Sequence, residues 1–187
     1  MVVYIFQGDY KNKNEELLRK ALQMYAEAFD INIDDLPLQK TANGKPYLEG
    51  MPLHFSISHT RMLWGCLISS QEVGLDIQEK RNVNFSKLAN RFFLEEEIKF
   101  VNDNGMDGFF DVWTRKEACI KYDGTGLRDL KSFCVVKNGE LTEKIDKDGS
   151  VCFVSAFELD NTVKCAYCCS MEDSSLQIRE LTAIGDG

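Results

Sequence analysis

Two short segments constrain the fold of this 187-residue chain more than the rest of its sequence. In residues 73–78 (VGLDIQ), apolar side chains alternate with small or polar ones, which is the period of a strand with one buried face. Asp76 and Gln78 therefore point to the same side of that strand. Residues 109–121 (FFDVWTRKEACIK) carry apolar side chains at helical spacing instead, and they predict a helix that presents Glu117.

The strand and the helix together indicate a cation site. Lys121 follows Glu117 by about one helical turn, so the amine and the acid share a face with Trp113. A strand offering Asp76 and Gln78 opposite a helix offering Glu117 would make an all-oxygen site for a hard divalent cation, with the lysine beside it to meet an anion. The plainer alternative is that the Glu–Lys pair is a surface salt bridge and that the aspartate is structural.

The composition limits the class of function. A formal net charge of −8, from 30 acidic and 22 basic residues, argues against a sequence-independent nucleic-acid binder, because phosphate contacts need clustered Lys and Arg. No apolar run reaches the ~20 residues that span a bilayer, and the N-terminus lacks the pattern of a signal peptide. We therefore expect a cytoplasmic protein that binds neither nucleic acid nor membrane.

The seven cysteines fit reduced thiols better than disulfides, because their number is odd and their spacing matches no disulfide framework. Cys165 and Cys168 have the C-x-x-C spacing of half a zinc site, but no second close Cys/His pair accompanies them. The strand-like pattern around them also places the two on opposite faces. We expect cysteines that pack in the core.

The order of the predicted elements indicates an α+β protein of two halves, residues 1–70 and 71–187, each with helices packed on an antiparallel sheet. The active site would lie in the cleft between them. We expect helical segments at 14–29, with Asn14 as N-cap, and at 84–93, 95–101 and 108–122. We expect strands at 2–8, 53–59, 62–68, 73–78, 132–137, 151–158 and 163–170, with two or all three of the second, third and fourth as antiparallel neighbours.

Five motifs in order resemble the 4′-phosphopantetheinyl transferases, in particular the surfactin-synthetase-activating type. They are GKP at 44–46, FSISH at 55–59, GLDIQ at 74–78, ANRFF at 89–93 ahead of Glu97, and WTRKEACIK at 113–121. The resemblance covers roughly residues 43–135. It implies a fold of two pseudo-twofold-related halves, Mg²⁺, and coenzyme A as co-substrate in the cleft between them. It also implies transfer of phosphopantetheine from coenzyme A to a serine of an apo acyl or peptidyl carrier protein, with release of 3′,5′-ADP.

The resemblance assigns roles to individual residues. Negative charge grows on the transferring and leaving phosphates, so a cation and fixed positive side chains are the expected catalytic devices. Glu97 would take the proton from the attacking serine, and Lys121 would stabilise the departing phosphate. The remaining roles are metal ligation by Asp76, Gln78 and Glu117, and coenzyme A contacts from Lys45, His59, Lys116 and Lys121.

Two departures from the family keep alternatives open. Gln78 stands where the family often has a second acid, so the metal site would be weaker or would have only two carboxylates. Only 75 residues precede Asp76, so the first half is short, although the length still favours a two-half monomer. One alternative is a catalytically weak or inactive module that binds coenzyme A or a carrier protein. Another is a different Mg²⁺-dependent nucleotide hydrolase or transferase.

Overall fold

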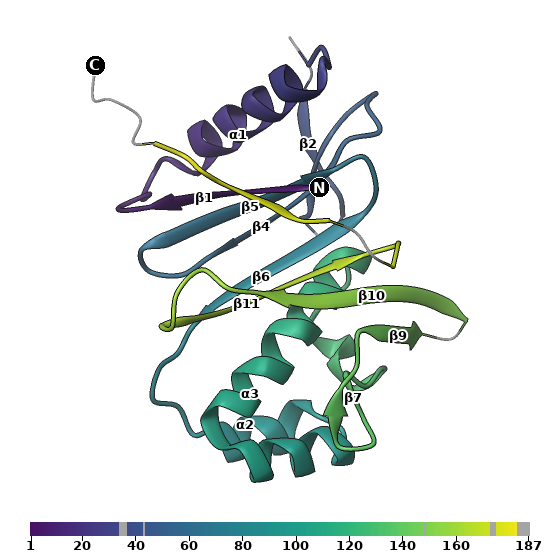
Figure 1. The fold of residues 1–187 in the computed structure, drawn as a ribbon. Helices are drawn as coiled ribbons and strands as arrows, with labels where there is room; N and C mark the ends of the chain where they lie inside the picture. The colour runs from purple at the N-terminus through teal and green to yellow at the C-terminus, as the bar shows by residue number, and fades with distance from the viewer. Residues whose placement is uncertain (34–36, 43, 148, 173–174, 183–187) are drawn as a thin grey trace.

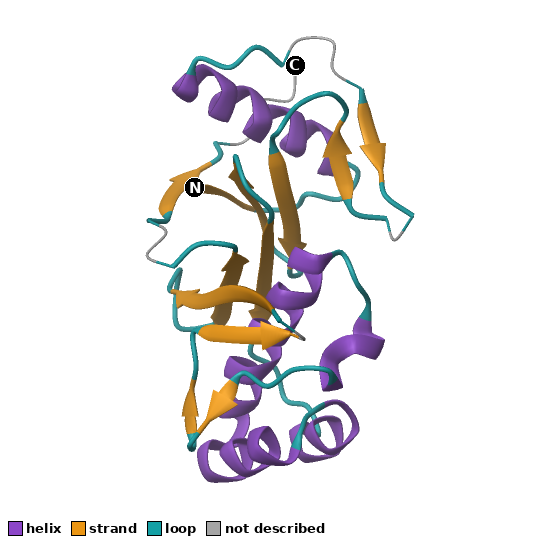
Figure 2. Ribbon diagram, turned by 90° about the vertical axis from the view of Figure 1, so that its right-hand side faces the viewer, coloured by secondary structure: helices purple, strands orange, loops and turns teal. Residues whose placement is uncertain are grey.

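The computed structural model describes residues 1–33, 37–42, 44–147, 149–172 and 175–182. Its main elements stack as a helix, two four-stranded sheets and a second layer of helices (Figure 1). Turned by 90°, the same stack has helices at both ends and strands between them (Figure 2). The expected α+β class, with helices packed on antiparallel sheets, is confirmed.

The first sheet has one helix on its outer face, α1 (Asn14–Phe29). Its strands, in spatial order, are β12 (Gln177–Glu180), β1 (Val2–Gln7), β5 (Leu63–Ser69) and β4 (His54–His59). All neighbours are antiparallel except β1 and β12. A small hairpin of β2 (Leu38–Lys40) and β3 (Pro46–Leu48) lies beside this half.

The second sheet is fully antiparallel and rests on the other helices. Its strands, in spatial order, are β6 (Val73–Glu79), β11 (Val163–Cys169), β10 (Ser150–Phe157) and β9 (Lys144–Lys147). Its helical elements are α2 (Phe85–Phe92), α3 (Glu95–Asp123) and a short 3-10 turn, η1 (Leu127–Lys131). A two-stranded hairpin, β7 (Val136–Lys137) and β8 (Glu140–Leu141), follows η1.

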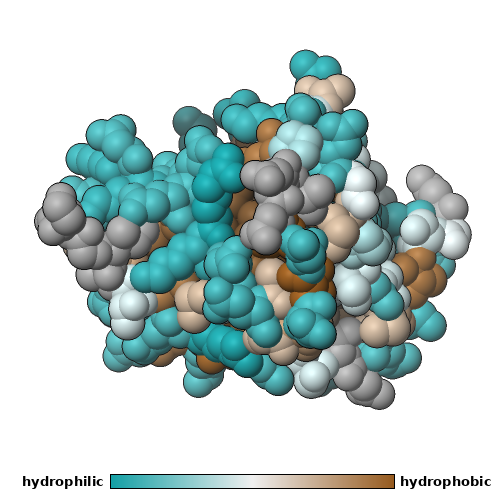
Figure 3. Space-filling model, turned by 90° about the horizontal axis from the view of Figure 1, so that it is seen from above, coloured by the Kyte–Doolittle hydropathy of each residue, from teal (hydrophilic) through white to brown (hydrophobic). Residues whose placement is uncertain are grey.

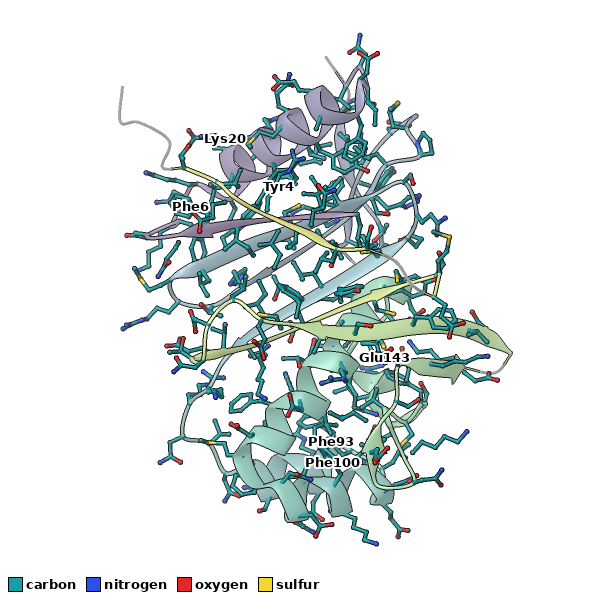
Figure 4. The ribbon with its side chains drawn as sticks, viewed as in Figure 1. Tyr4, Phe6, Lys20, Phe93, Phe100 and Glu143 are labelled. Atoms are coloured by element: carbon teal, nitrogen blue, oxygen red, sulfur yellow. The ribbon has the colours of Figure 1, made fainter. Side chains whose placement is uncertain are left out.

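Three apolar cores hold the layers together, as the strand alternation requires. Tyr4 and Phe6 on β1 face α1, whereas Val3 and Ile5 on the same strand face the second sheet. Phe93 belongs to the third core, between the second sheet and its helices (Figure 4). The outermost face beside α1 is covered mostly by hydrophilic side chains (Figure 3).

Beside the apolar core that lies between the two sheets, β4 runs against β6, and serine hydroxyls join the two strands there. The backbone N–H of Leu75 donates to Ser56 Oγ, and the N–H of Ile77 donates to Ser58 Oγ, both at 3.0 Å. These amides lie on the edge of β6 that does not face β11, so the hydroxyls replace the partner strand of an ordinary ladder. An unpaired buried amide costs about 1–3 kcal/mol, which explains small hydroxyl residues at both positions.

Two glycines shape α3, which supplies one wall of the site. Gly105 has φ 64° and ψ −144° and kinks the helix, so the separate segments expected at 95–101 and 108–122 are two parts of α3. At the other end, Gly74 of β6 lies directly against α3. An added Cβ there would come within 2.0 Å of the backbone oxygen of Ala118.

The structure confirms most expected elements and corrects others. Lys13, not Asn14, is the N-cap of α1, and of the strand expected at 132–137 only β7 is a strand, because residues 132–135 form bends and irregular backbone after η1 ends at Lys131. β6 pairs with β11 and not with β5, which puts it in the second sheet. The C-terminal strand β12 crosses back to β1, so residues 177–180 complete the sheet of the first half. Among the described residues, no helix is both long and apolar enough to cross a membrane.

The close approach of β6 to α3 yields a stability prediction. We expect Gly74→Ala to lower the free energy of unfolding by about 1–3 kcal/mol or more, because the new methyl group meets helix backbone that can yield only if α3 moves. Gly126→Ala is the control, since nothing lies within 4 Å of its Cβ position. Urea denaturation measures both variants. Equal stability of the two would contradict the tight contact.

Candidate functional site

A cleft of about 400 Å³ opens at the seam between the two halves. β4 contributes Ser58 and His59 to its wall, and β6 contributes Asp76 and Gln78. α3 closes it with Trp113, Glu117 and Lys121, which share one face of the helix as their spacing predicts. Residues from the two halves thus converge on one cavity.

Asp76 is the centre of the polar network in this cleft, and it is almost completely buried. Its Oδ1 accepts hydrogen bonds from Lys121 Nζ at 2.7 Å and Ser58 Oγ at 3.1 Å. Its Oδ2 accepts one from Gln78 Nε2 at 3.0 Å. The Lys121 amine also donates to Ser58 Oγ at 3.1 Å, which closes a triangle of contacts around Oδ1.

Glu117 carries a carboxyl group that is hard to ionise. Burial, followed by the negative charge of Asp76, raises the pKa of Glu117 to about 7, although the Lys121 ammonium acts in the opposite direction. The single positive charge of Lys121 therefore has to balance the negative charges of both Asp76 and Glu117. Additional positive charge between them would favour ionisation of both.

The donor set of the cleft fits a hard divalent cation. Such ions take oxygen ligands, and Mg²⁺ usually takes one or two carboxylates plus water and phosphate oxygens. Asp76 and Glu117 supply two carboxyl groups whose mutual repulsion a cation would relieve. Gln78 presents its amide nitrogen to Asp76, so in this structure it orients the carboxylate as a donor.

The other two residues predicted to contact coenzyme A, His59 and Lys45, line different cavities. His59 lines the cleft, is exposed, and shares a hydrogen bond of 3.2 Å with the hydroxyl of Tyr10. Lys45 lines an adjacent hollow of about 230 Å³, which Lys121 also borders. The Lys45 amine is held by Glu72 at 2.7 Å and by the backbone oxygens of Val73 and Tyr122.

Glu97 and Lys116, for which roles at the reacting phosphates were predicted, are not among the residues that line the cleft. Both side chains are 0% exposed and form an ion pair of 2.6 Å. Glu97 also accepts hydrogen bonds from the backbone N–H groups of Leu94 and Val135, and Lys116 donates to the Phe133 oxygen. In this arrangement neither can touch a ligand in the cleft. The pair instead ties the first turn of α3 to its second part and to the segment after η1.

Sequence reasoning missed part of the cleft wall. Arg81, an exposed cation, lines it just after β6, and Phe109, Phe110 and Trp113 form an apolar side with Leu88 of α2. The basic pair Lys80–Arg81 directly after the GLDIQ strand was the available signal for Arg81. The aromatic residues were read only as helix packing, because a helical pattern does not say which packing face borders a cavity.

The cysteines pack in the core, as expected. Cys165 and Cys168 lie on opposite faces of β11, in different apolar cores. Cys168 instead gathers with Cys119 and Cys152, their sulfurs within 4.8 Å of one another, all buried between α3 and the second sheet. Burial raises the pKa of Cys119 and Cys168, which keeps these thiols protonated.

The comparison with known proteins points to one family. The model of the 4′-phosphopantetheinyl transferase superfamily matches residues 72–170. The 4′-phosphopantetheinyl transferase Sfp of Bacillus subtilis (strain 168) is 29% identical over 153 residues, which cover 78% of this chain and 68% of that protein. The 4′-phosphopantetheinyl transferase gsp of Aneurinibacillus migulanus is 32% identical over 181 residues, 89% of this chain and 73% of that protein.

The buried ion pair predicts a large loss of stability when one partner is removed. We expect Lys116→Met to lower the free energy of unfolding by about 3–5 kcal/mol, because it leaves the Glu97 carboxylate buried without its cation. Adding Glu97→Gln should restore part of the loss, since the double variant has no buried charge there. Arg19→Met, which breaks an exposed ion pair with Glu15, is the control and should change little. Chemical denaturation of all three variants is the measurement.

The raised pKa of Glu117 predicts a pH dependence of stability without divalent cations. The folded protein keeps a proton that the unfolded chain releases between the ordinary value of 4.5 and about 7, so the free energy of unfolding should fall as pH rises through this window. Glu117→Gln cannot ionise and should lack this component. Denaturation of both proteins at about pH 5 and about pH 8 tests this. Parallel pH profiles would contradict it.

Proposed function

The chain belongs to the 4′-phosphopantetheinyl transferase superfamily, and on that premise we propose that it moves phosphopantetheine from coenzyme A to a serine of an apo acyl or peptidyl carrier protein, with Mg²⁺ in the cleft. The observation that carries this proposal is the convergence of Asp76, Glu117 and Lys121 on one cavity at the seam of the two halves. Two carboxyl groups and an amine form the set of charges that the handling of a pyrophosphate requires.

The reaction needs no redox step and no covalent enzyme intermediate. The oxygen of the carrier serine forms a bond to the phosphorus that bears pantetheine, and the bond from that phosphorus to the bridging oxygen breaks. The hydroxyl proton of the serine passes to a water molecule, and 3′,5′-ADP leaves with the electron pair of the broken bond as a new phosphate negative charge. The protein's tasks are to hold the two substrates in line and to balance the growing charge.

The side chains of the cleft divide these tasks. Lys121 borders both the main cleft and the hollow beside Lys45, so its amine is placed to meet phosphate oxygens that cross from one to the other. His59 and Arg81 line the open part of the cleft and can donate to further phosphate oxygens. Asp76 and Glu117 would hold Mg²⁺, with Gln78 orienting Asp76. The ion would offset the charge of the pyrophosphate and favour departure of the leaving phosphate.

The remaining features support the finer parts of the proposal. The apolar side of the cleft, formed by Phe109, Phe110, Trp113 and Leu88, suits the uncharged pantetheine arm or an apolar side chain of a carrier protein. Residues from both sheets, among them Ser58 of β4 and Asp76 of β6, meet in the cleft, and we propose on this basis that the protein acts as a monomer. The seven cysteines, all of which lie in the described part of the chain, form no disulfides, which supports a reducing compartment such as the cytoplasm.

The deciding experiment is mass spectrometry of apo carrier proteins incubated with this protein, coenzyme A and Mg²⁺. A mass gain of one phosphopantetheine group on the carrier serine is the expected result, and it should disappear with a chelator. A panel of fatty-acid, polyketide and peptide-synthetase carriers identifies the substrate class. Binding without a mass gain on any carrier would overturn the proposed transfer and favour a binding module.

The same assay tests the roles of the cleft residues. We expect Asp76→Ala and Glu117→Ala to lose at least about 100-fold in transfer rate, and Lys121→Ala to lose a similar factor, because each removes a group that balances transition-state charge. Lys137→Ala, on the hairpin β7–β8, is the control for loss of a surface charge. Circular dichroism checks that the variants stay folded. Full activity of either acid variant would defeat the assignment of the metal ligands.

A further inference from the structure

We infer that Ser58 is a positioning residue that fixes the Asp76 carboxylate and the Lys121 amine relative to each other, and so sets the affinity of the cleft for a divalent cation. The inference rests on the proposed function, because it gives Ser58 a role in preparing that same site. Ser58 lies on β4 in the first half, whereas the two charged groups come from β6 and α3 in the second. Its hydroxyl is therefore a direct link from the first half to the charged groups.

The hydrogen bonds of Ser58 use its full capacity. A hydroxyl can donate one hydrogen bond and accept two. Ser58 Oγ donates to Asp76 Oδ1 at 3.1 Å and accepts from the Ile77 N–H at 3.0 Å and from Lys121 Nζ at 3.1 Å. Because the side chain is only 4% exposed, water has little access to substitute for any of the three partners. The hydroxyl orientation, and with it the direction of the Asp76 carboxylate, is thus fixed.

Ser58 orients Asp76 from the side opposite to Gln78. Ser58 and Lys121 hold Oδ1, and Gln78 Nε2 holds Oδ2 at 3.0 Å. A carboxylate held at both oxygens cannot rotate freely, so a cation meets lone pairs that already point in set directions. Loss of a group that holds a metal ligand in place typically lowers metal affinity or activity about 10- to 100-fold.

Ser56 provides a matched control from the same strand. It is equally buried, at 4% exposed, and its Oγ accepts the Leu75 N–H at the same 3.0 Å. Replacing either serine with alanine leaves one edge amide of β6 without its partner. Only Ser58 also contacts the charged groups of the cleft, so a difference between the two variants isolates the positioning role.

The experiment compares Ser58→Ala with Ser56→Ala in two measurements. The first is a titration of the intact protein with Mn²⁺, followed by electron paramagnetic resonance of the free ion, because Mn²⁺ shares the oxygen-ligand preference of Mg²⁺. We expect Ser58→Ala to raise the dissociation constant about 10- to 100-fold and Ser56→Ala to leave it within about twofold. The second is the transfer assay over a range of Mg²⁺ concentrations. There Ser58→Ala should shift the half-activating concentration upward by a comparable factor, while a purely structural role would not.

Urea denaturation should give similar midpoints for the two variants, which confirms that the seam is weakened equally. If Ser58→Ala does not fold, Ser58→Cys replaces it, because a thiol fills similar space but is a weak donor and acceptor. Equal Mn²⁺ affinities of the two serine variants would overturn the inference, as would a wild-type protein that binds no Mn²⁺. If the Mn²⁺ titration behaves as expected but the wild type transfers nothing, the positioning role stands and the proposed function fails.

Discussion

The hydroxyl-to-amide contact between β4 and β6 is the constraint on which the rest of the site depends. The two sheets do not continue a common ladder here: β6 pairs with β11 along one edge, and the amides on its other edge meet serine hydroxyls of β4 instead of a strand backbone. Serine has the smallest side chain that carries a hydroxyl. It can therefore accept hydrogen bonds from the buried amides that lack a partner strand, while the two backbones approach closely. That close approach carries Asp76 to the hydroxyl of Ser58 and opens the cleft directly at the seam.

The wall opposite the seam is made rigid by other means. α3 must present Glu117 and Lys121 to β6, yet it is kinked at Gly105, where a long helix could otherwise move as two segments. The buried pair of Glu97 and Lys116 bridges that kink, because the acid lies before it and the amine after it. The contact of Gly74 with the backbone of α3 then fixes the distance between helix and sheet. Buried residues outside the lining of the cleft thus determine where its charged groups lie.

The sequence predicted the helices and strands of the site well, but it predicted poorly which partner each charged side chain contacts. The backbone geometry of a strand makes alternate residues of 73–78 share a face, and that of a helix does the same for Trp113, Glu117 and Lys121. The structure has both arrangements as predicted. The resemblance assigned Glu97 to the proton of the attacking serine and Lys116 to coenzyme A, whereas the structure buries each side chain against the other, a pairing that sequence spacing does not reveal. Likewise the pairing of β12 with β1 joins residues near opposite ends of the chain, and no local pattern announces such a pairing. The resemblance to a family located the cleft but did not distinguish residues that line it from residues that support it.

The charges of the cleft are arranged for a ligand more than for the stability of the protein alone. A single amine from Lys121 faces two carboxyl groups, and the result is a pKa of about 7 for Glu117, well above its ordinary value. A site built only for stability would separate the two acids or give each its own cation, as the interior does for Glu97 with Lys116. Asp76 and Glu117, which share one lysine, lie at the seam instead, where Ser58, Gln78 and Lys121 hold Asp76 in one orientation. Under the proposed function, such a preorganised and under-compensated pair would gain most from a divalent cation and a pyrophosphate together, because the cation would offset the charge of the two acids and leave the Lys121 amine for the anion.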